Sequence, residues 1–220
     1  DFADIRLISL SAEAFENWLP LNATEIDHAP HGDEPASIIY SSGTTGTPKG
    51  IVQSHRYRSR ILTGGATRGY TPDAVTLLAT PLYSNTTLAS FLQTFGVGGH
   101  VVLMTKFNAE SWLSTAQRHR VTHAMLVPVM IERILRDPNF DTTDLSSFRM
   151  KYCTSAPFSA DLKREVLARW PGGLIEFYGM TEGGATFTLR AHEFPDKLHT
   201  VGQIAPGGIV RIVNESGEDV

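Results

Sequence analysis

Short apolar runs alternate with amphipathic stretches over most of the chain. The runs have the length of buried strands, and the stretches between them carry apolar residues at helical spacing. Strands are predicted at 75–80, 100–104, 124–127, 150–153 and 174–177, and helices at 86–95, 108–120, 128–135 and 159–170. Strands that alternate with helices of about ten residues predict an α/β fold, with mainly parallel sheets covered by helices on both faces.

Particular residues mark where three of these helices begin. Asn108 and Ser159 precede helical stretches, and their side chains can accept hydrogen bonds from the free N–H groups of a first turn. Pro128 suits a first helical position, because its missing N–H would have no partner there. These three residues therefore fix the predicted starts.

The same patterns extend to both ends of the chain. Alternation over 209–213 predicts a further strand near the C-terminal end. In the first part of the chain, a strand is predicted at 5–10, followed by a helix that Ser11 caps and that ends at about residue 19. A surface connection over 20–35 leads to short strands at 37–39 and 51–53, and a helix is predicted over 55–62.

Composition limits the class of protein. The chain has 220 residues, of which 41% are hydrophobic, enough for one large domain or two small ones. Its net charge of −4 gives no support for nucleic-acid binding, and no apolar run approaches the roughly 18 residues of a membrane span. The single cysteine, Cys153, excludes an internal disulfide and favours a reducing, cytoplasmic location.

The stretch from Tyr40 to Gly50 contains the chemical groups that a polyphosphate site needs. It follows a short apolar run, and its glycines allow the backbone N–H groups to point into one concavity. A flexible linker is the simpler interpretation, but linkers seldom lie between two strand-like runs. The nucleotide-hydrolase P-loop fails on spacing, because Pro48 stands where glycine is required. The groups suited to phosphate are Ser41, Ser42, Gly43, Thr44, Thr45, Gly46, Thr47 and Lys49.

The sequence YSSGTTGTPKG resembles the phosphate-loop signature of the adenylate-forming superfamily. That superfamily holds acyl-CoA synthetases, luciferase-like enzymes and peptide-synthetase adenylation domains. The resemblance implies an ATP site, in which Lys49 acts as a catalytic residue that neutralises the β- and γ-phosphates. It also implies that Ser41, Ser42, Gly43, Thr44, Thr45, Gly46 and Lys49 contact the nucleotide.

A second segment, 176–184, follows a predicted strand, at the kind of crevice where open α/β sheets bind ligands. It resembles the family's Y-G-x-T-E motif, which implies that Tyr178 stacks on adenine, Thr181 bonds a phosphate and Glu182 holds Mg²⁺. An aromatic face, a hydroxyl and a hard oxygen suit these partners. Taken alone, the segment is also compatible with an ordinary strand-to-turn junction. The nucleotide-binding set here is Glu176, Phe177, Tyr178, Gly179 and Thr181, with Thr181 and Glu182 catalytic.

The turn Ser155-Ala156-Pro157 resembles the family's G-A-P turn, which lies beside adenine and the substrate carboxylate. A small-residue turn before a capped helix is also routine. The segment 80–86 resembles the wall of the acyl pocket and implies substrate contacts from Tyr83, Ser84 and Asn85. Ser84 stands where many CoA ligases have histidine, so this chain departs from that pattern.

Several residues are better explained without a site. No acidic residue occurs over 80–92, where amino-acid-activating relatives place an aspartate for the substrate ammonium, so a free amino acid is disfavoured. His119 and His123 lack an acidic third ligand for a metal. The arginines at 56, 58 and 60 are interpreted as a solvated face rather than a phosphate patch. Cys153 is expected in the core.

The resemblance implies an AMP-forming acyl-CoA synthetase that uses ATP, Mg²⁺ and CoA and acts on a fatty or aryl carboxylic acid. It implies that residues 1–200 belong to the α/β core of the large domain, that 201–220 begin a β subdomain, and that the small mobile C-terminal domain and the ribose-binding aspartate are absent from this chain. Two alternatives stay open: an enzyme that loads a carrier-protein thiol, and a catalytically silent nucleotide-binding fragment. The oligomeric state is open as well.

Overall fold

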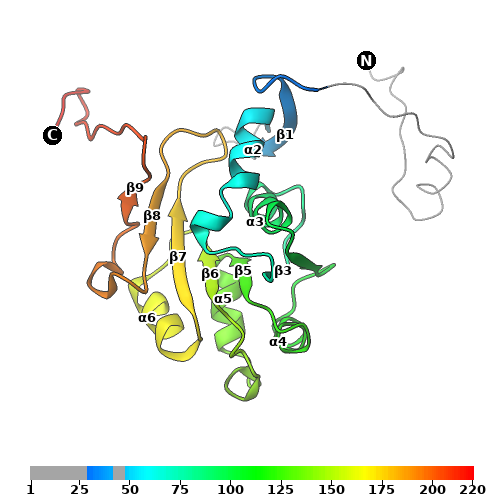
Figure 1. Cartoon of the computed structure of the whole chain (residues 1–220). Coiled ribbons are helices and arrows are strands. Elements are labelled where there is room, and N and C mark those ends of the chain that lie inside the picture. Colours follow the sequence, from blue (N-terminus) through cyan, green and yellow to red (C-terminus); the bar gives the residue numbers. More distant parts are fainter. Residues whose placement is uncertain (1–28, 42–47) are drawn as a thin grey trace, which may run out of the picture. The chain divides into compact units, whose positions relative to one another are not determined.

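The computed structural model describes residues 29–41 and 48–220, and Gly32–Val220 form one compact unit (Figure 1). A seven-stranded sheet has the order β4-β3-β5-β6-β7-β8-β9, and a separate two-stranded sheet pairs β1 with β2. The predicted elements before residue 29 lie outside the described residues. The strands are β1 Pro35–Ser41, β2 Lys49–Ser54, β3 Val75–Leu78, β4 His100–Leu103, β5 His123–Leu126, β6 Met150–Cys153, β7 Gly173–Tyr178, β8 Phe187–Arg190 and β9 Gln203–Ile204.

The described part of this unit contains five α-helices, and each agrees with a predicted stretch to within two residues at both ends. They are α2 His55–Thr63, α3 Asn85–Gly96, α4 Ala109–Arg118, α5 Pro128–Leu135 and α6 Ala160–Arg169, with short 3₁₀ turns at Ala66–Arg68, Phe140–Thr142 and Pro195–Lys197.

The large sheet is mainly parallel. Each neighbouring pair from β4 to β7 runs parallel, and β8 and β9 continue the sheet antiparallel. This arrangement confirms the predicted fold class. β8 and β9 were not predicted from the sequence; both are short and lie between glycine-containing turns.

Side chains that alternate along the strands divide the core into two layers. Leu77, Ala124 and Cys153 face the layer packed by α4, α5 and α6. Their neighbours Leu78 and Tyr152 face the opposite layer, which α3 and the segment around Tyr70 cover. Both faces of the sheet are therefore buried, as expected for parallel strands.

The predicted helix starts are confirmed. The side chain of Asn108 accepts a hydrogen bond from the Ser111 N–H at 2.9 Å, and that of Ser159 accepts one from the Leu162 N–H at 3.2 Å. Pro128 is the first residue of α5. The caps stabilise each first turn by roughly 1 kcal/mol, and they fix where the polypeptide leaves the sheet and enters each helix.

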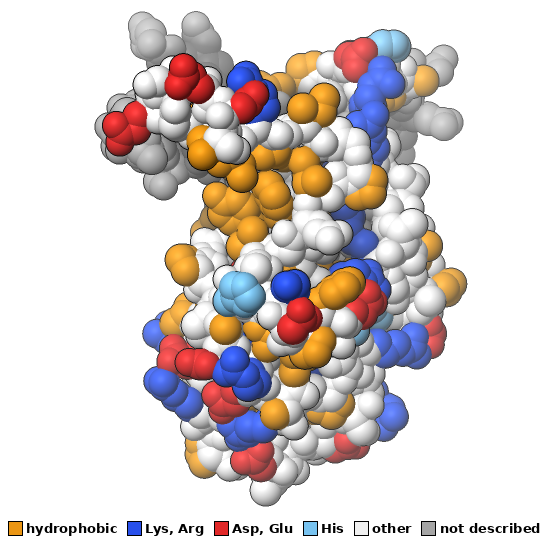
Figure 2. Space-filling model, turned by 90° about the vertical axis from the view of Figure 1, so that its left-hand side faces the viewer, with side chains coloured by type: hydrophobic (Ala, Val, Ile, Leu, Met, Phe, Trp, Pro, Cys, Tyr) orange, Lys and Arg blue, Asp and Glu red, His pale blue; other side chains and the backbone are white. Residues whose placement is uncertain are grey.

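The predicted strand at 209–213 is wrong. Within the described residues, this segment forms only an isolated bridge between Val213 and Asp219. Ile209 is 91% exposed and Ile212 is 72% exposed. A segment with alternating apolar residues forms a stable strand only when a neighbouring strand pairs with it and a surface buries its apolar face. No described residue supplies either of these here. Hydrophobic side chains gather near this C-terminal segment, whereas charges of both signs are interspersed over the lower part of the same side (Figure 2).

Candidate active site

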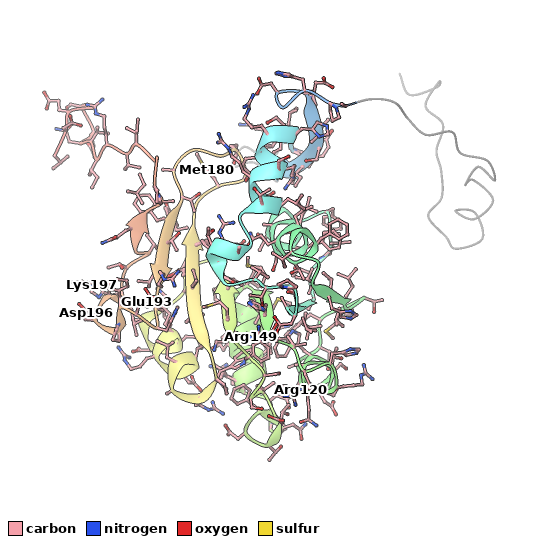
Figure 3. The ribbon with its side chains drawn as sticks, in the orientation of Figure 1. Arg120, Arg149, Met180, Glu193, Asp196 and Lys197 are labelled. Atoms are coloured by element: carbon pink, nitrogen blue, oxygen red, sulfur yellow. The ribbon has the colours of Figure 1, made fainter. Side chains whose placement is uncertain are left out.

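Three turns meet at one edge of the sheet, because the strands before them run parallel. The turns follow β3, β6 and β7 and contain the segments 79–84, 154–157 and 179–184. Met180 marks this carboxyl edge, and Arg120 and Arg149 lie at the opposite end of the strands (Figure 3). The topology therefore brings together the segments that the sequence analysis selected.

A cavity of about 460 Å³ lies beside the ends of β6 and β7. All the nucleotide contacts predicted at 155–157 and 176–179 line this cavity. The lining comprises Thr154, Ser155, Ala156, Pro157, Phe158, Lys163, Glu176, Phe177, Tyr178, Gly179, His199, Thr200 and Val201. We call it the nucleotide cavity, after the nucleotide contacts predicted for these residues. The lining residues outside the predicted set are Thr154, Phe158, Lys163, His199, Thr200 and Val201.

Two features make the mouth of the nucleotide cavity suitable for a flat ring. Tyr178 is 58% exposed, and its ring lies 5.9 Å from that of Phe187 at a tilt of 58°, which leaves an aromatic face open. Ser155 has a φ of 76°, a left-handed conformation that non-glycine residues adopt rarely. The turn after β6 therefore has a backbone conformation that the end of a strand does not normally need.

A buried ion pair forms the wall of the nucleotide cavity. Lys163 Nζ lies 2.5 Å from Glu176 Oε2, and both side chains are at most 6% exposed. The same ammonium donates to the carbonyl oxygens of Leu198 and Thr200 at 2.9 and 3.0 Å. Burial raises the pKa of Glu176, and the hydrogen bond from Lys163 opposes this shift. Glu176 is therefore a fixed wall residue with its carboxylate already engaged.

A second cavity, of about 430 Å³, adjoins the first and shares Thr154, Ser155, Phe177 and Gly179 with it. We call it the acyl cavity, after the acyl contact predicted for Asn85. Thr181 and Glu182, predicted for phosphate and Mg²⁺, also line this cavity and do not line the nucleotide cavity. The Thr86 and Ser155 hydroxyl oxygens lie 3.0 Å apart in its wall. The other lining residues are Tyr57, Ile61, Arg68, Asn85, Ala89, Gln93, Met125, Met180, Thr181, Glu182 and Thr186.

Of the three predicted substrate contacts, Asn85 lines the acyl cavity. Tyr83 is 81% exposed, and Ser84 precedes α3 as its N-cap residue; neither lines either cavity. The predicted substrate contacts end at Asn85, and the rest of the α3 face that forms the wall was not predicted. Thr86, Ala89 and Gln93 lie on α3 at the spacing of one helix face, and this periodicity was visible in the sequence.

The phosphate-loop residues Ser42, Gly43, Thr44, Thr45, Gly46 and Thr47 lie outside the described residues, as does the side chain of Ser41. The strands on either side of the loop are described. Ser41 pairs with Lys49 in the antiparallel hairpin of β1 and β2, and Lys49 is exposed. The nucleotide contacts assigned to this loop stay predictions.

Glu182 is exposed on the loop that follows β7. Gly183 and Gly184 have φ values of 102° and 83°, so the loop turns sharply after this carboxylate through conformations that require glycine. Among residues 29–41 and 48–220, no group of three or more His, Cys, Asp or Glu side chains could hold a metal by itself. A single carboxylate suits Mg²⁺ that is also bound by phosphates.

Across the same described ranges, none of the helices is both long and apolar enough to cross a membrane.

Comparisons with known proteins identify the family and agree with the fold. The family model described as AMP-binding enzyme matches residues 4–220. The chain is 30% identical to 4-coumarate–CoA ligase 3 of Arabidopsis thaliana over 96% of its length and covers 41% of that ligase. It thus spans less than half of this curated relative.

Two solved structures share the fold. Apo MbtA from Mycobacterium smegmatis matches 94% of this chain with a TM-score of 0.82 and 28% identity, and the match covers 39% of that chain. The o-succinylbenzoate CoA synthetase MenE from Bacillus subtilis, in complex with AMP, matches 86% of this chain and 39% of its own with a TM-score of 0.74 and 27% identity. The resemblance to the adenylate-forming superfamily is confirmed: this chain belongs to the family of AMP-binding enzymes.

Proposed function

We propose that the full-length protein converts a carboxylic acid into its acyl-adenylate with ATP, and then into a thioester with CoA. The observation that carries the proposal is the shared wall of the two cavities. The nucleotide cavity and the acyl cavity meet at Ser155 and Gly179, so an AMP moiety in one and an acyl group in the other would join at that wall.

In the first step, an oxygen of the substrate carboxylate attacks the α-phosphorus of ATP, and pyrophosphate leaves with the electrons of the broken P–O bond. The protein contributes by positioning the two reactants and by stabilising charge on the phosphates. Tyr178 and the 155–157 turn would hold adenine, Thr181 would donate to a phosphate oxygen, and Lys49 would neutralise the departing pyrophosphate.

Glu182 would hold Mg²⁺ together with the phosphates of ATP. Its carboxylate is exposed beside Thr181, and one hard oxygen donor plus substrate phosphates is the usual ligand set of this ion. The ion supplies additional charge neutralisation during phosphoryl chemistry. In the second step, the thiol of CoA attacks the acyl carbon, and AMP is the leaving group.

The acyl cavity favours an acid without a cationic tail. Glu182 is the single acidic residue in its lining, and we assign that residue to the metal. The ammonium of a free amino acid would therefore be buried without a counter-ion, which is costly. Fatty and aryl acids are the substrates that the proposal expects, in line with the aryl acid in the name of the Arabidopsis ligase.

The test is ATP–pyrophosphate exchange by the full-length protein across fatty, aryl and amino acids, followed by product analysis with CoA or a carrier domain as acceptor. The proposal expects exchange with a fatty or aryl acid and acyl-CoA as the product. Exchange with free amino acids alone would contradict the substrate class, and transfer to the carrier domain alone would contradict the acceptor.

A further inference from the structure

Arg58 departs from the solvated face expected for the arginines of α2. Arg56 and Arg60 are exposed, but Arg58 is half-buried between α2, β1 and α3. Its Nε donates to Ser37 Oγ at 3.0 Å, and its Nη1 donates to Asn85 Oδ1 at 3.0 Å. The expectation was therefore wrong for Arg58, because the side chain turns back over the start of α3.

The guanidinium of Arg58 has no counter-ion within the described part of the chain. Its two hydrogen-bond partners are neutral oxygen acceptors, and its Nη2 is buried without an acceptor. Burial lowers the pKa of this guanidinium from its ordinary value. The partners of this half-buried charge are therefore two neutral oxygens and the Tyr57 ring, whose centroid lies 5.7 Å from Arg58 Cζ, and no carboxylate is among them.

The contact with Arg58 fixes the orientation of the Asn85 carboxamide. A guanidinium has donors and no acceptor, so the atom of Asn85 that faces it must be the amide oxygen. Asn85 also lines the acyl cavity. The group that Asn85 has left for a ligand is therefore its NH₂, which carries two N–H donors and lies beside an unneutralised positive charge.

No described residue accepts a hydrogen bond from that NH₂, although Gln93 and Glu182 also line the acyl cavity. The Thr86 and Ser155 hydroxyls face each other at 3.0 Å. Tyr57, Ile61 and Ala89 contribute mainly apolar surface. A purely hydrocarbon tail placed here would leave the donors of Asn85 dry and unpaired, which costs free energy.

We propose that the enzyme prefers acids whose acyl tail carries a carbonyl or ether oxygen, which accepts a hydrogen bond from Asn85 in the orientation set by Arg58. Asn85 is the specificity-determining contact, and Arg58 is a positioning residue that acts through it. The inference rests on the proposed function and narrows its substrate class from fatty and aryl acids in general to those with an oxygen acceptor.

The experiment measures kcat/KM for ATP–pyrophosphate exchange by the full-length protein with matched acids. Octanoic acid is compared with each of the mono-oxo-octanoic acids, and phenylbutanoic acid with its γ-oxo analogue, so that the members of each pair differ by one CH₂ replaced by a carbonyl. A hydrogen bond gained to a donor that the acyl tail covers predicts that kcat/KM for the best oxo-octanoic acid exceeds that for octanoic acid by roughly five- to tenfold.

Asn85→Asp is the diagnostic variant. It retains an oxygen facing Arg58 and replaces the NH₂ by a second oxygen, so the bridge between α2 and α3 survives while the donors are lost. The keto-to-octanoic ratio should fall to about one. Arg58→Met should also lower the ratio, because the amide is then free to turn over. Arg60→Met, an exposed arginine on the same helix, is the matched control and should leave the ratio unchanged.

The possible outcomes test the inference and the proposed function separately. A keto preference that disappears in Asn85→Asp and persists in Arg60→Met supports the inference. Exchange with octanoic or phenylbutanoic acid without any keto preference, or a preference that survives Asn85→Asp, overturns the inference and leaves the proposed function standing. No exchange with any carboxylic acid overturns both.

Discussion

Gln53 donates a hydrogen bond from its side-chain amide to the backbone carbonyl of Thr181, 128 residues further along the chain, at 2.9 Å. Gln53 is only 4% exposed, and its own amide oxygen has no partner. The bond joins β2, the strand that begins at Lys49, to the loop that carries Glu182. The two segments assigned to the triphosphate and its metal are thus linked by one side-chain hydrogen bond.

We therefore predict that Gln53→Met, which keeps the length and removes the donor, slows acyl-adenylate formation by roughly two- to tenfold, the loss expected for one hydrogen bond. Thioester formation from supplied acyl-adenylate should change less, since pyrophosphate has already left. Gln117→Met, at an exposed glutamine on α4, is the control. Equal losses in both half-reactions would show that Gln53 only supports the fold.

Lys49 and Glu182 should respond differently to mutation. Lys49→Ala should slow acyl-adenylate formation by roughly ten- to a thousandfold, the cost of one lost charge-stabilising donor. It should leave thioester formation nearly unchanged. Glu182→Gln should also slow the first step and raise the Mg²⁺ concentration needed for the half-maximal rate. Single-turnover kinetics over a Mg²⁺ titration measures both effects.

Both side chains are exposed, so stability should survive either change. Lys106→Ala, at another exposed lysine, is a matched control for loss of surface charge. Equal damage to the two half-reactions by Lys49→Ala, or an unchanged metal dependence in Glu182→Gln, would show that the assigned roles are wrong.

The stability of the core should depend on pH through His123. The ring is buried in β5, lies 4.5 Å from the Tyr70 ring in a stacked arrangement, and places Nε2 at 3.1 Å from the Gly69 carbonyl oxygen. Burial lowers the pKa of His123 from 6.5 to about 4. Between these values the unfolded chain binds the proton and the folded chain does not, so stability should fall as the pH drops from about 6.5 to about 4.

The expected slope from this one group is at most about 1.4 kcal/mol per pH unit. Urea unfolding at several pH values should therefore show a flatter pH dependence in His123→Gln than in the wild type over this range. His119→Gln, at an exposed histidine, should retain the wild-type slope. A His123→Gln slope equal to that of the wild type would contradict the assignment.

Much of the fold followed from local patterns, because the parallel strands are buried on both faces and read as short apolar runs. The caps at Asn108 and Ser159 located helix starts from chemistry that acts within a single turn. The failure at 209–213 has the opposite origin, since a strand needs a partner and the pattern within one segment does not say whether a partner is present.

In the candidate site, too, residues of contiguous motifs could be predicted, whereas contacts between distant segments could not. Tyr178 and Ser155 belong to motifs contiguous in sequence, so they could be selected before the fold was known. The Gln53–Thr181 bond and the burial of Arg58 depend on how β2 and α2 meet distant loops. No local pattern distinguishes Arg58 from Arg56 or Arg60, and only the fold shows that it faces Asn85.

The most direct test of the account is a crystal structure of the full-length protein with a non-hydrolysable acyl-adenylate analogue, such as an acyl sulfamoyl adenosine. The account predicts that the adenine lies between Tyr178 and the 155–157 turn in the nucleotide cavity, and that the acyl tail enters the acyl cavity beside Asn85. Binding of the nucleoside at another place, such as the opposite end of the sheet near Arg120 and Arg149, would contradict it.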